Sequence, residues 1–288
     1  PFVQTLAALV LLTVSATGAG SIDINDTGAA NTKYLVDFVT ATGEDTTFLN
    51  KDALVVNAFD GANSITVNIA NARDAALAAV TVNTGNGTNT VTLTSKAGLN
   101  GAATLTVNGG TGTDTLTGAL IINATLTSSV ANGFSGTAGT GNNFTNIDVI
   151  TGAGTGTLTG ENNASTWALD GTPTYNDSTS TLGFTGFATL QGGTAADTFT
   201  VTAASTFDVK GGAGADVFTF TAATLTGTLD GEAASDTLNG SSIVNVTLTG
   251  SGANGFTGTT AAVSGGFAGV DVITGAGTGT LTGENNAS

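Results

Sequence analysis

Four aspartates stand at the ends of glycine-rich segments and are the side chains of this chain best suited to binding a metal ion. They are Asp114, Asp197, Asp216 and Asp236. Carboxylate and turn carbonyl oxygens are the ligands that Ca²⁺ prefers in proteins. If the segments stack as neighbouring strands, the carboxylates approach to about 5 Å. Like charges at that distance repel, so a cation between them is stabilising. The spacing therefore predicts a Ca²⁺ site formed by these four residues.

The same aspartates can also serve as turn caps. An Asp side chain accepts hydrogen bonds from backbone N–H groups of its own turn, and this role needs no metal. The sequence leaves both interpretations open. Asp148 and Asp271 lack the preceding Gly-Gly pair, and we expect them to be turn or strand-edge residues.

A second set of acidic residues lies close to aromatic ones. Glu161, Asp170 and Asp177 flank Trp167 and Tyr175 in the sequence. Two carboxylates beside an aromatic platform are typical of enzymes that cleave sugars. The chain contains no His and no Cys, however, which removes the commonest catalytic base and nucleophile. We expect these residues to serve packing and predict no enzymatic activity.

The glycine-aspartate segments resemble a known repeat. Residues 211–218 (GGAGADVF) and 109–116 (GGTGTDTL) match the RTX-type nonapeptide G-G-x-G-x-D-x-U-x, and residues 192–199 and 231–238 match it with glycines missing. More broadly, residues 80–288 resemble the very large β-strand-repeat proteins of bacterial cell surfaces, which are adhesin-like, S-layer-like or haemagglutinin-like. The resemblance implies Ca²⁺ bound between coils through the Asp and turn carbonyls. Here each motif stands alone instead of following the previous one directly.

Internal repetition extends beyond these motifs. Residues 148–165 (DVITGAGTGTLTGENNAS) recur unchanged at residues 271–288, and weaker matches continue upstream at an offset of 122 residues, as from Asp114 to Asp236. A period this long must contain several smaller structural units. We expect the parent protein to continue after Ser288 with residues similar to Thr166 and those that follow it.

Between the turns, apolar and threonine residues alternate with a period of two. This alternation, bounded by Gly and Asn, predicts short strands. Strands at a spacing of about 20 residues predict an all-β fold, a parallel β-solenoid with coils of about 20 residues; tandem β-sandwich domains are the alternative. Residues 72–80 are the best candidate for a short helix. We expect an N-terminal segment over residues 1–75, a first solenoid unit over 76–165 and a second over 166–288.

Composition restricts the partners. The net charge is −16, only 9% of residues are charged, 40% are hydrophobic, and 43 are Gly. A polyanion such as nucleic acid requires a basic surface, which five basic residues cannot supply. The absence of Cys excludes disulfides and thiolate metal sites. This composition is suited to an extracellular or cell-surface protein whose stability comes from repetition.

The N-terminal residues 1–14 are apolar. The run is too short for a membrane span, which needs about 20 apolar residues, so we predict no membrane span. Two interpretations remain: a buried strand or end cap, or a segment exchanged into a neighbouring subunit.

Together these patterns predict a non-enzymatic structural segment of a secreted microbial surface protein, forming a fibre, rod or coat. Its main partner is expected to be further copies of itself, joined end to end or laterally, with residues 1–14 as a candidate contact. Glycans are expected as further partners. The alternatives are an adhesin module that binds a surface or host glycan, and a β-helix enzyme acting on polysaccharides.

Overall fold

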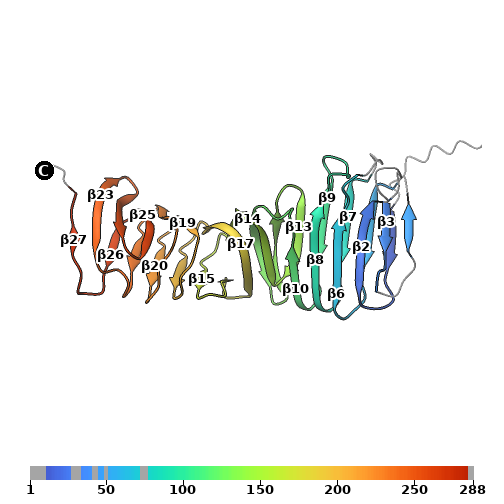
Figure 1. Ribbon diagram of the computed structural model, residues 1–288, viewed down its shortest axis with the longest axis horizontal. Coiled ribbons are helices and arrows are strands. Elements are labelled where there is room, and N and C mark those ends of the chain that lie inside the picture. The colour runs from blue at the N-terminus through green and yellow to red at the C-terminus, as the bar shows by residue number, and fades with distance from the viewer. Residues whose placement is uncertain (1–10, 27–33, 41–44, 49–50, 72–76, 285–288) are drawn as a thin grey trace, which may run out of the picture. The chain divides into compact units, whose positions relative to one another are not determined.

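The computed structural model describes residues 11–26, 34–40, 45–48, 51–71 and 77–284 (Figure 1). Within these ranges the protein is all-β, with 27 strands, no helix, and a large sheet whose pairings are mostly parallel. The expected all-β class is thus confirmed. The short helix expected over residues 72–80 is not found in its described part, because Ala79 begins a strand; residues 72–76 lie outside the described residues.

The chain forms two compact units. Unit 1 comprises Pro1–Ile121 and Thr137–Val149, and unit 2 comprises Ile122–Gly136 and Ile150–Ser288. Two strands, β12 (Gly133–Ala138) and β14 (Val149–Thr159), carry residues of both units.

Unit 1 contains two parallel ladders, in which β5, β6, β7 and β8 each pair with the strand two positions further along the chain. The ladders run β1–β5–β7–β9–β13 and β2–β6–β8–β10. β3 pairs with β2 in antiparallel fashion, and β4 pairs in the same way with β3. The strands are β1 (Leu11–Ser15), β2 (Ser21–Asp26), β3 (Tyr34–Asp37), β4 (Thr46–Phe48), β5 (Ala53–Asn57), β6 (Asn63–Asn68), β7 (Ala79–Asn83), β8 (Gly87–Ser95), β9 (Thr104–Asn108), β10 (Gly112–Thr117) and β13 (Asn142–Ile147).

The register of unit 1 places like residues above one another. Val82 pairs with Val56 on one side and Val107 on the other, and all three are fully buried. At the ends of the same strands, the Asn83 side-chain N–H donates to Asn57 Oδ1 over 2.6 Å. Asn108 donates in turn to Asn83 over 2.8 Å. These partners are 26 and 25 residues apart, so the repeat of unit 1 is longer than the expected 20 residues.

Unit 2 also contains parallel ladders, β15–β18–β20–β22–β26 and β17–β19–β21–β25, with shorter pairs β11–β14 and β23–β27. Two antiparallel excursions, β15–β16–β17 and β23–β24–β25, interrupt the parallel pattern. The strands are β11 (Ala124–Val130), β14 (Val149–Thr159), β15 (Thr166–Leu169), β16 (Thr174–Asn176), β17 (Thr181–Gln191), β18 (Thr198–Val201), β19 (Asp208–Ala213), β20 (Val217–Phe220), β21 (Leu229–Ala233), β22 (Thr237–Asn239), β23 (Val246–Gly252), β24 (Gly255–Thr260), β25 (Val263–Val270), β26 (Val272–Thr274) and β27 (Leu281–Thr282).

The core of unit 2 is organised around a column of aromatic rings. Phe199 lies between Trp167 and Phe218, with ring centroids 5.3 and 5.2 Å away and nearly parallel planes. The parallel register continues the column through Leu238 to Ile273. Because side chains alternate across a strand, the threonines between these positions point away from the core. The alternation in the sequence thus becomes an apolar interior beneath a threonine-rich exterior.

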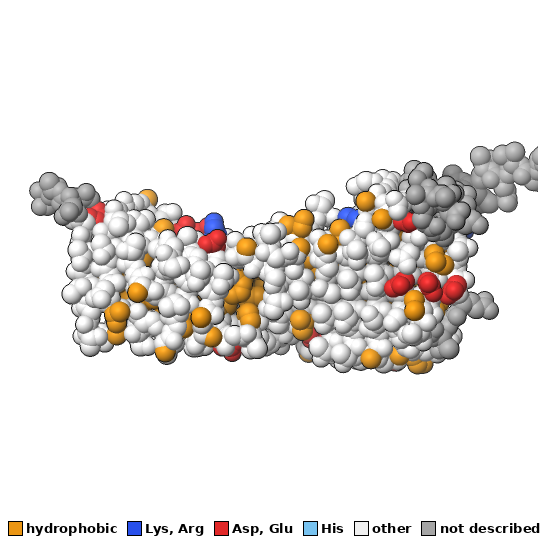
Figure 2. Space-filling view, in the orientation of Figure 1, with side chains coloured by type: hydrophobic (Ala, Val, Ile, Leu, Met, Phe, Trp, Pro, Cys, Tyr) orange, Lys and Arg blue, Asp and Glu red, His pale blue; other side chains and the backbone are white. Residues whose placement is uncertain are grey.

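The long repeat is present in the strands as well. β23 begins at Val246, 122 residues after β11 begins at Ala124, and β24 begins at Gly255, 122 residues after Gly133. On the face drawn in Figure 2, charged and hydrophobic side chains are scattered over a surface made mostly of backbone and uncharged polar side chains.

Candidate functional site

The four predicted metal-binding aspartates occupy equivalent, buried positions at the beginnings of strands. Asp197, Asp216 and Asp236 directly precede β18, β20 and β22, and Asp114 is the third residue of β10. Their exposed fractions are 1%, 0%, 0% and 1% respectively. The first three lie on successive strands of one parallel ladder in unit 2. Asp114 belongs to unit 1.

In unit 2 each carboxylate accepts a hydrogen bond from the backbone of the preceding strand. Asp216 Oδ1 accepts the N–H of Asp197 over 2.7 Å, and Asp236 Oδ1 accepts the N–H of Asp216 over 2.8 Å. Asp197 Oδ1 accepts the N–H of Ser165 over 2.9 Å, and Asp271 Oδ2 accepts the N–H of Asp236 over 2.9 Å. We call these five residues, from Ser165 to Asp271, the aspartate ladder.

Unit 1 carries a mixed version with asparagine. Asp148 Oδ2 accepts the N–H of Asp114 over 2.8 Å, and Asp114 Oδ1 accepts the side-chain N–H of Asn89 over 2.8 Å. Asn89 Oδ1 accepts both the backbone and the side-chain N–H of Asn63, over 3.2 and 2.8 Å. The same position is therefore filled by an amide in one place and a carboxyl group in another.

Asp148 and Asp271 join these ladders, although the sequence marked them only as turn or edge residues. They follow the preceding ladder aspartate by 34 and 35 residues, against 19 and 20 within the aspartate ladder. In unit 2 the longer interval contains the excursion β23–β24–β25. A signal was present nonetheless, because both residues begin the two identical eighteen-residue blocks.

The Gly-Gly pairs are explained by close backbone approach. A Cβ atom at Gly211 would lie 2.3 Å from Asp216 Oδ2, and one at Gly193 would lie 1.8 Å from the carbonyl oxygen of Glu161. No side chain fits at either distance. Glycine is therefore required at both positions, because its missing side chain leaves room for the carboxylate at Gly211 and for the backbone of the neighbouring strand at Gly193.

Burial changes the protonation of the ladder. It raises the pKa of Asp216 to about 7, and the negative charges of Asp236 and Asp197 add to the increase, while the N–H of Asp197 opposes it. Burial likewise raises the pKa of Asp236 to about 6. It also raises the pKa of Asp114 and Asp197, against hydrogen bonds that lower it. The Oδ2 atoms of Asp216 and Asp236 are buried without a hydrogen-bond partner. Such atoms are stable when the carboxyl group is neutral.

These surroundings fit hydrogen-bonded carboxyl groups. Ca²⁺ takes six to eight oxygen ligands, whereas Oδ1 of Asp197, Asp216 and Asp236 each accepts a backbone N–H. The turn-cap interpretation agrees with two contacts: Gly110 N–H donates to Asp114 Oδ2 over 3.0 Å, and Gly193 N–H donates to Asp197 Oδ2 over 2.8 Å. Among the described residues, no group of three or more acidic side chains is placed to hold a metal ion.

Removing calcium is therefore expected to leave the protein's stability unchanged. A hydrogen-bonded ladder does not need a cation, so dialysis against a chelator should not shift the melting temperature, and restoring millimolar Ca²⁺ should not raise it. Differential scanning calorimetry measures both, with Mg²⁺ as the control for general ionic effects. A fall of several degrees on chelation, reversed by Ca²⁺ alone, would establish the metal site.

The second acidic set contains a buried carboxyl pair. Glu161 and Asp177 are 4% and 5% exposed. Burial raises the pKa of Glu161 to about 7, and its side-chain hydrogen bond with Asp177 contributes. Burial acts upward on Asp177 too, but the Ser129 hydroxyl and the N–H groups of Ser180 and Thr179 lower its pKa overall. The shared proton therefore resides on Glu161.

Two buried aromatic residues belong to the same cluster as Glu161. Trp167 and Tyr175 have exposed fractions of 0%, and their centroids are 4.8 Å apart in an edge-to-face arrangement. The Tyr175 hydroxyl accepts the N–H of Glu161 over 3.0 Å. Asp170 lies apart from the pair and caps its own turn by accepting the N–H and hydroxyl of Thr172. The structure thus joins Glu161 to Asp177 but leaves Asp170 outside.

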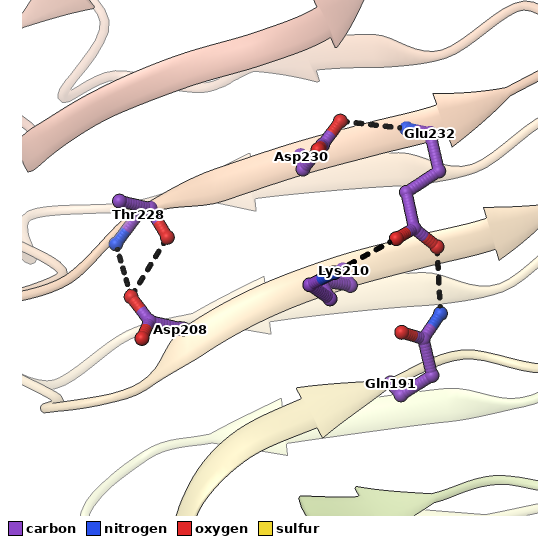
Figure 3. Close-up of polar contacts among 6 residues, drawn as sticks. All are labelled: Gln191, Asp208, Lys210, Thr228, Asp230 and Glu232. Atoms are coloured by element: carbon purple, nitrogen blue, oxygen red, sulfur yellow. Dashed lines mark hydrogen bonds and ion pairs between the residues drawn. The ribbon is translucent and has the colours of Figure 1, made fainter.

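An exposed polar cluster on β17, β19 and β21 was not singled out in the sequence (Figure 3). Lys210 forms an ion pair with Glu232 over 3.0 Å, and the Gln191 amide donates to the same carboxylate over 2.8 Å. Asp208 accepts both the N–H and the hydroxyl of Thr228. An exposed pair of this kind contributes at most about 1 kcal/mol. In the sequence these residues follow only the ordinary alternation of a strand, so no motif marks them.

None of the described residues belongs to a helix that could cross a membrane. Comparison with protein-family models, with curated proteins and with solved structures finds no significant match to this chain.

Proposed function

We propose that this chain is a non-enzymatic structural segment of a secreted microbial surface protein, which forms an extracellular fibre, rod or coat by β-solenoid stacking. The observation that carries the proposal is the in-register parallel stacking of like residues. Trp167, Phe199 and Phe218 form one such column, and the aspartate ladder forms another. In such stacking each added coil buries the same kinds of residues as the coil before it, so the protein can grow longer by repetition.

The solenoid interpretation rests on how the ladders alternate. Strands of one ladder are separated along the chain by a strand of the other, so the chain returns to each ladder at regular intervals. Unit 2 contains a third parallel row, in which Leu225 bridges Ser205 and Val263. Three parallel rows visited in turn are what a coiled path of the chain produces. The sandwich alternative would instead require mainly antiparallel pairing.

The proposed location follows from the surface. A chain with 9% charged residues and no Cys is kept hydrated by threonine, asparagine and glycine, and needs no reducing compartment. The resemblance to bacterial cell-surface repeat proteins supports the same location.

The buried aromatic residues argue against the two alternative functions. A sugar-cleaving or sugar-binding site at the acidic-aromatic cluster requires an open face on which a sugar ring can stack. Trp167 and Tyr175 are instead fully enclosed, and the carboxyl pair is buried as well. Their contacts support a packing role.

Electron microscopy tests the structural role directly. Purified protein, concentrated at neutral pH without added metal, is expected to form filaments or a lattice with a regular repeat, because exposed ends of parallel sheets pair with one another. Diluting the same sample provides the control for concentration-dependent assembly. Isolated particles with the mass of one chain at every concentration, confirmed by sedimentation, would reject the proposal.

A further inference from the structure

The two identical eighteen-residue blocks have different surroundings. The upstream block (residues 148–165) contains Leu158, which is 0% exposed, whereas its counterpart Leu281 in the downstream block (residues 271–288) is 65% exposed. The upstream block forms the 11-residue strand β14, whereas the described residues of the downstream block, 271–284, form β26 and β27, of 3 and 2 residues. Since the sequences are identical, the difference comes from what covers them.

On the inner side the two blocks make the same contact. A Cβ atom at Gly156 would lie 1.4 Å from the carbonyl oxygen of Ile122, and one at Gly279 would lie 1.2 Å from that of Val244. Both glycines therefore face the backbone two residues before a strand, β11 for Gly156 and β23 for Gly279, at similar distances. The preceding structure supports both blocks equally.

On the outer side the contacts differ. A Cβ atom at Gly160 would lie 2.9 and 3.0 Å from the rings of Tyr175 and Trp167, whereas nothing lies within 4 Å of the equivalent position at Gly283. One at Gly152 would meet the ring of Phe187 at 2.8 Å. No described residue supplies such a layer at Gly283.

The layer that covers the upstream block is supplied mainly by β17. Its backbone binds the block, as the N–H of Gly160 donates to the carbonyl oxygen of Gln191 over 2.9 Å. The hydroxyls of Thr151 and Thr185 meet at 3.2 Å. The apolar side chains of β17 are buried, namely those of Leu182, Phe184, Phe187 and Leu190.

The downstream block leaves an apolar groove of about 250 Å³, which we call the end groove. Its apolar lining comes from Ile243, Val244, Val246, Ile273 and Leu281, and the rest is mostly glycine. Val272 beside it is 46% exposed. Of the lining residues, Ile243 and Val246 are buried at the bottom of the groove, whereas Leu281 is 65% exposed.

We propose that the end groove binds an extended segment with the chemistry of β17, in which aromatic and aliphatic side chains face the groove while threonine and glycine face outward. The upstream block demonstrates the fit, because the same residues are covered by that segment within this chain. Binding is by strand addition, with glycine allowing close backbone approach. The inference rests on the structural role proposed above for its biological meaning.

A peptide of residues 174–193 with a fluorescent label and a solubilising lysine tail tests this proposal. Fluorescence anisotropy with the whole protein is expected to show saturable binding. The variant Leu281→Asp should weaken it by at least about tenfold, because a charge enters the groove. The matched control is Val130→Asp, a 51% exposed valine elsewhere in unit 2, which should bind as the native protein does. A peptide with Phe184→Asp and Phe187→Asp should not bind.

The possible results distinguish a failure of the proposed groove binding from a failure of the proposed structural role. Absence of saturable binding, or binding unaffected by Leu281→Asp, would overturn the proposal. Circular dichroism checks that this variant folds, as expected for a residue already 65% exposed. Self-association abolished by Leu281→Asp without any peptide binding would identify a second copy as the occupant, and would also overturn it. Peptide binding by a protein that forms no filament or lattice would keep the groove and reject the structural role.

Discussion

Replacing Phe199 with alanine is expected to destabilise unit 2 by about 3–5 kcal/mol, the usual cost of removing a buried aromatic side chain. Phe199 is fully buried and lies between the rings of Trp167 and Phe218 in the aromatic column. Its loss leaves a cavity and removes both stacking contacts, each of which contributes about 0.5–1.5 kcal/mol beyond burial. Few single substitutions elsewhere in the chain should have a larger effect.

Urea denaturation followed by tryptophan fluorescence measures this effect. Trp167 is the chain's single tryptophan and contacts Phe199 directly, so its emission reports the unfolding of unit 2. The matched control is Phe256→Ala, the same substitution at a residue of unit 2 that is 38% exposed, with a smaller expected cost. Equal effects of the two substitutions would show that the column does not hold unit 2 together.

The stability of unit 2 is expected to fall as the pH rises from 5 to 8. Asp216, Asp236 and Glu161 have pKa values of about 7, 6 and 7 in the folded protein, above their ordinary values of 3.8, 3.8 and 4.5. Each group is therefore protonated when folded and ionised when unfolded over much of this range. The stability that these three groups contribute is fully present at pH values below their ordinary pKa values. It is lost as the pH rises through their folded-state pKa values of about 6 and 7.

The size of this effect follows from the shift. One pKa unit corresponds to about 1.4 kcal/mol, so Asp216 alone contributes on the order of 4 kcal/mol between the two ends of its titration. Urea midpoints at pH 5, 6, 7 and 8 measure the slope. An unfolding free energy independent of pH, or one that rises over this interval, would show that the ladder carboxyl groups are ionised in the folded protein.

The variant Asp216→Asn isolates the ladder from the other groups. An amide retains an oxygen to accept the N–H of Asp197 and cannot ionise, and Asn89 already occupies the corresponding position in unit 1. The variant is expected to be more stable than the native protein at pH 8, by on the order of 3 kcal/mol, and nearly equal at pH 5. The matched control is Asp208→Asn, because hydrogen bonds from Thr228 lower the pKa of Asp208 and its titration lies below this range. If Asp208→Asn stabilised the protein at pH 8 as much as Asp216→Asn does, the reduced net charge would be the cause of both effects.

The fold class was predictable because alternation is a strong local signal. Strands such as β18 and β20 follow the pattern Thr-Phe-Thr-Val and Val-Phe-Thr-Phe, and both alternate between intermediate and buried residues. The repeat length was only partly predictable. Spacing between turns gave 19 and 20 residues for unit 2, but the structure of unit 1 advances by 25 and 26.

The site was predictable as a set of positions but not as a set of contacts. The motif identified Asp197, Asp216 and Asp236, which do lie on neighbouring strands. Sequence could not say whether their partners are cations or N–H groups, because that depends on which backbone atoms the stacked strands present. Nor could it join Glu161 to Asp177, since the hairpin β15–β16–β17 that brings them together is interrupted by turns with no strong spacing signal.

The two blocks have the same sequence but different strands, so the local conformation depends more on the strands packed beside a block than on its own sequence. In such a one-dimensional system each layer gains order from the one beside it, so the free energy needed to open a backbone amide should rise from an uncovered edge towards the interior. Amides of β26 and β27 would exchange with solvent first, and those of β14 last, although the two share their sequence. The difference in opening free energy between an amide of the upstream block and its counterpart in the downstream block would then measure how much one added layer stabilises the strand beneath it.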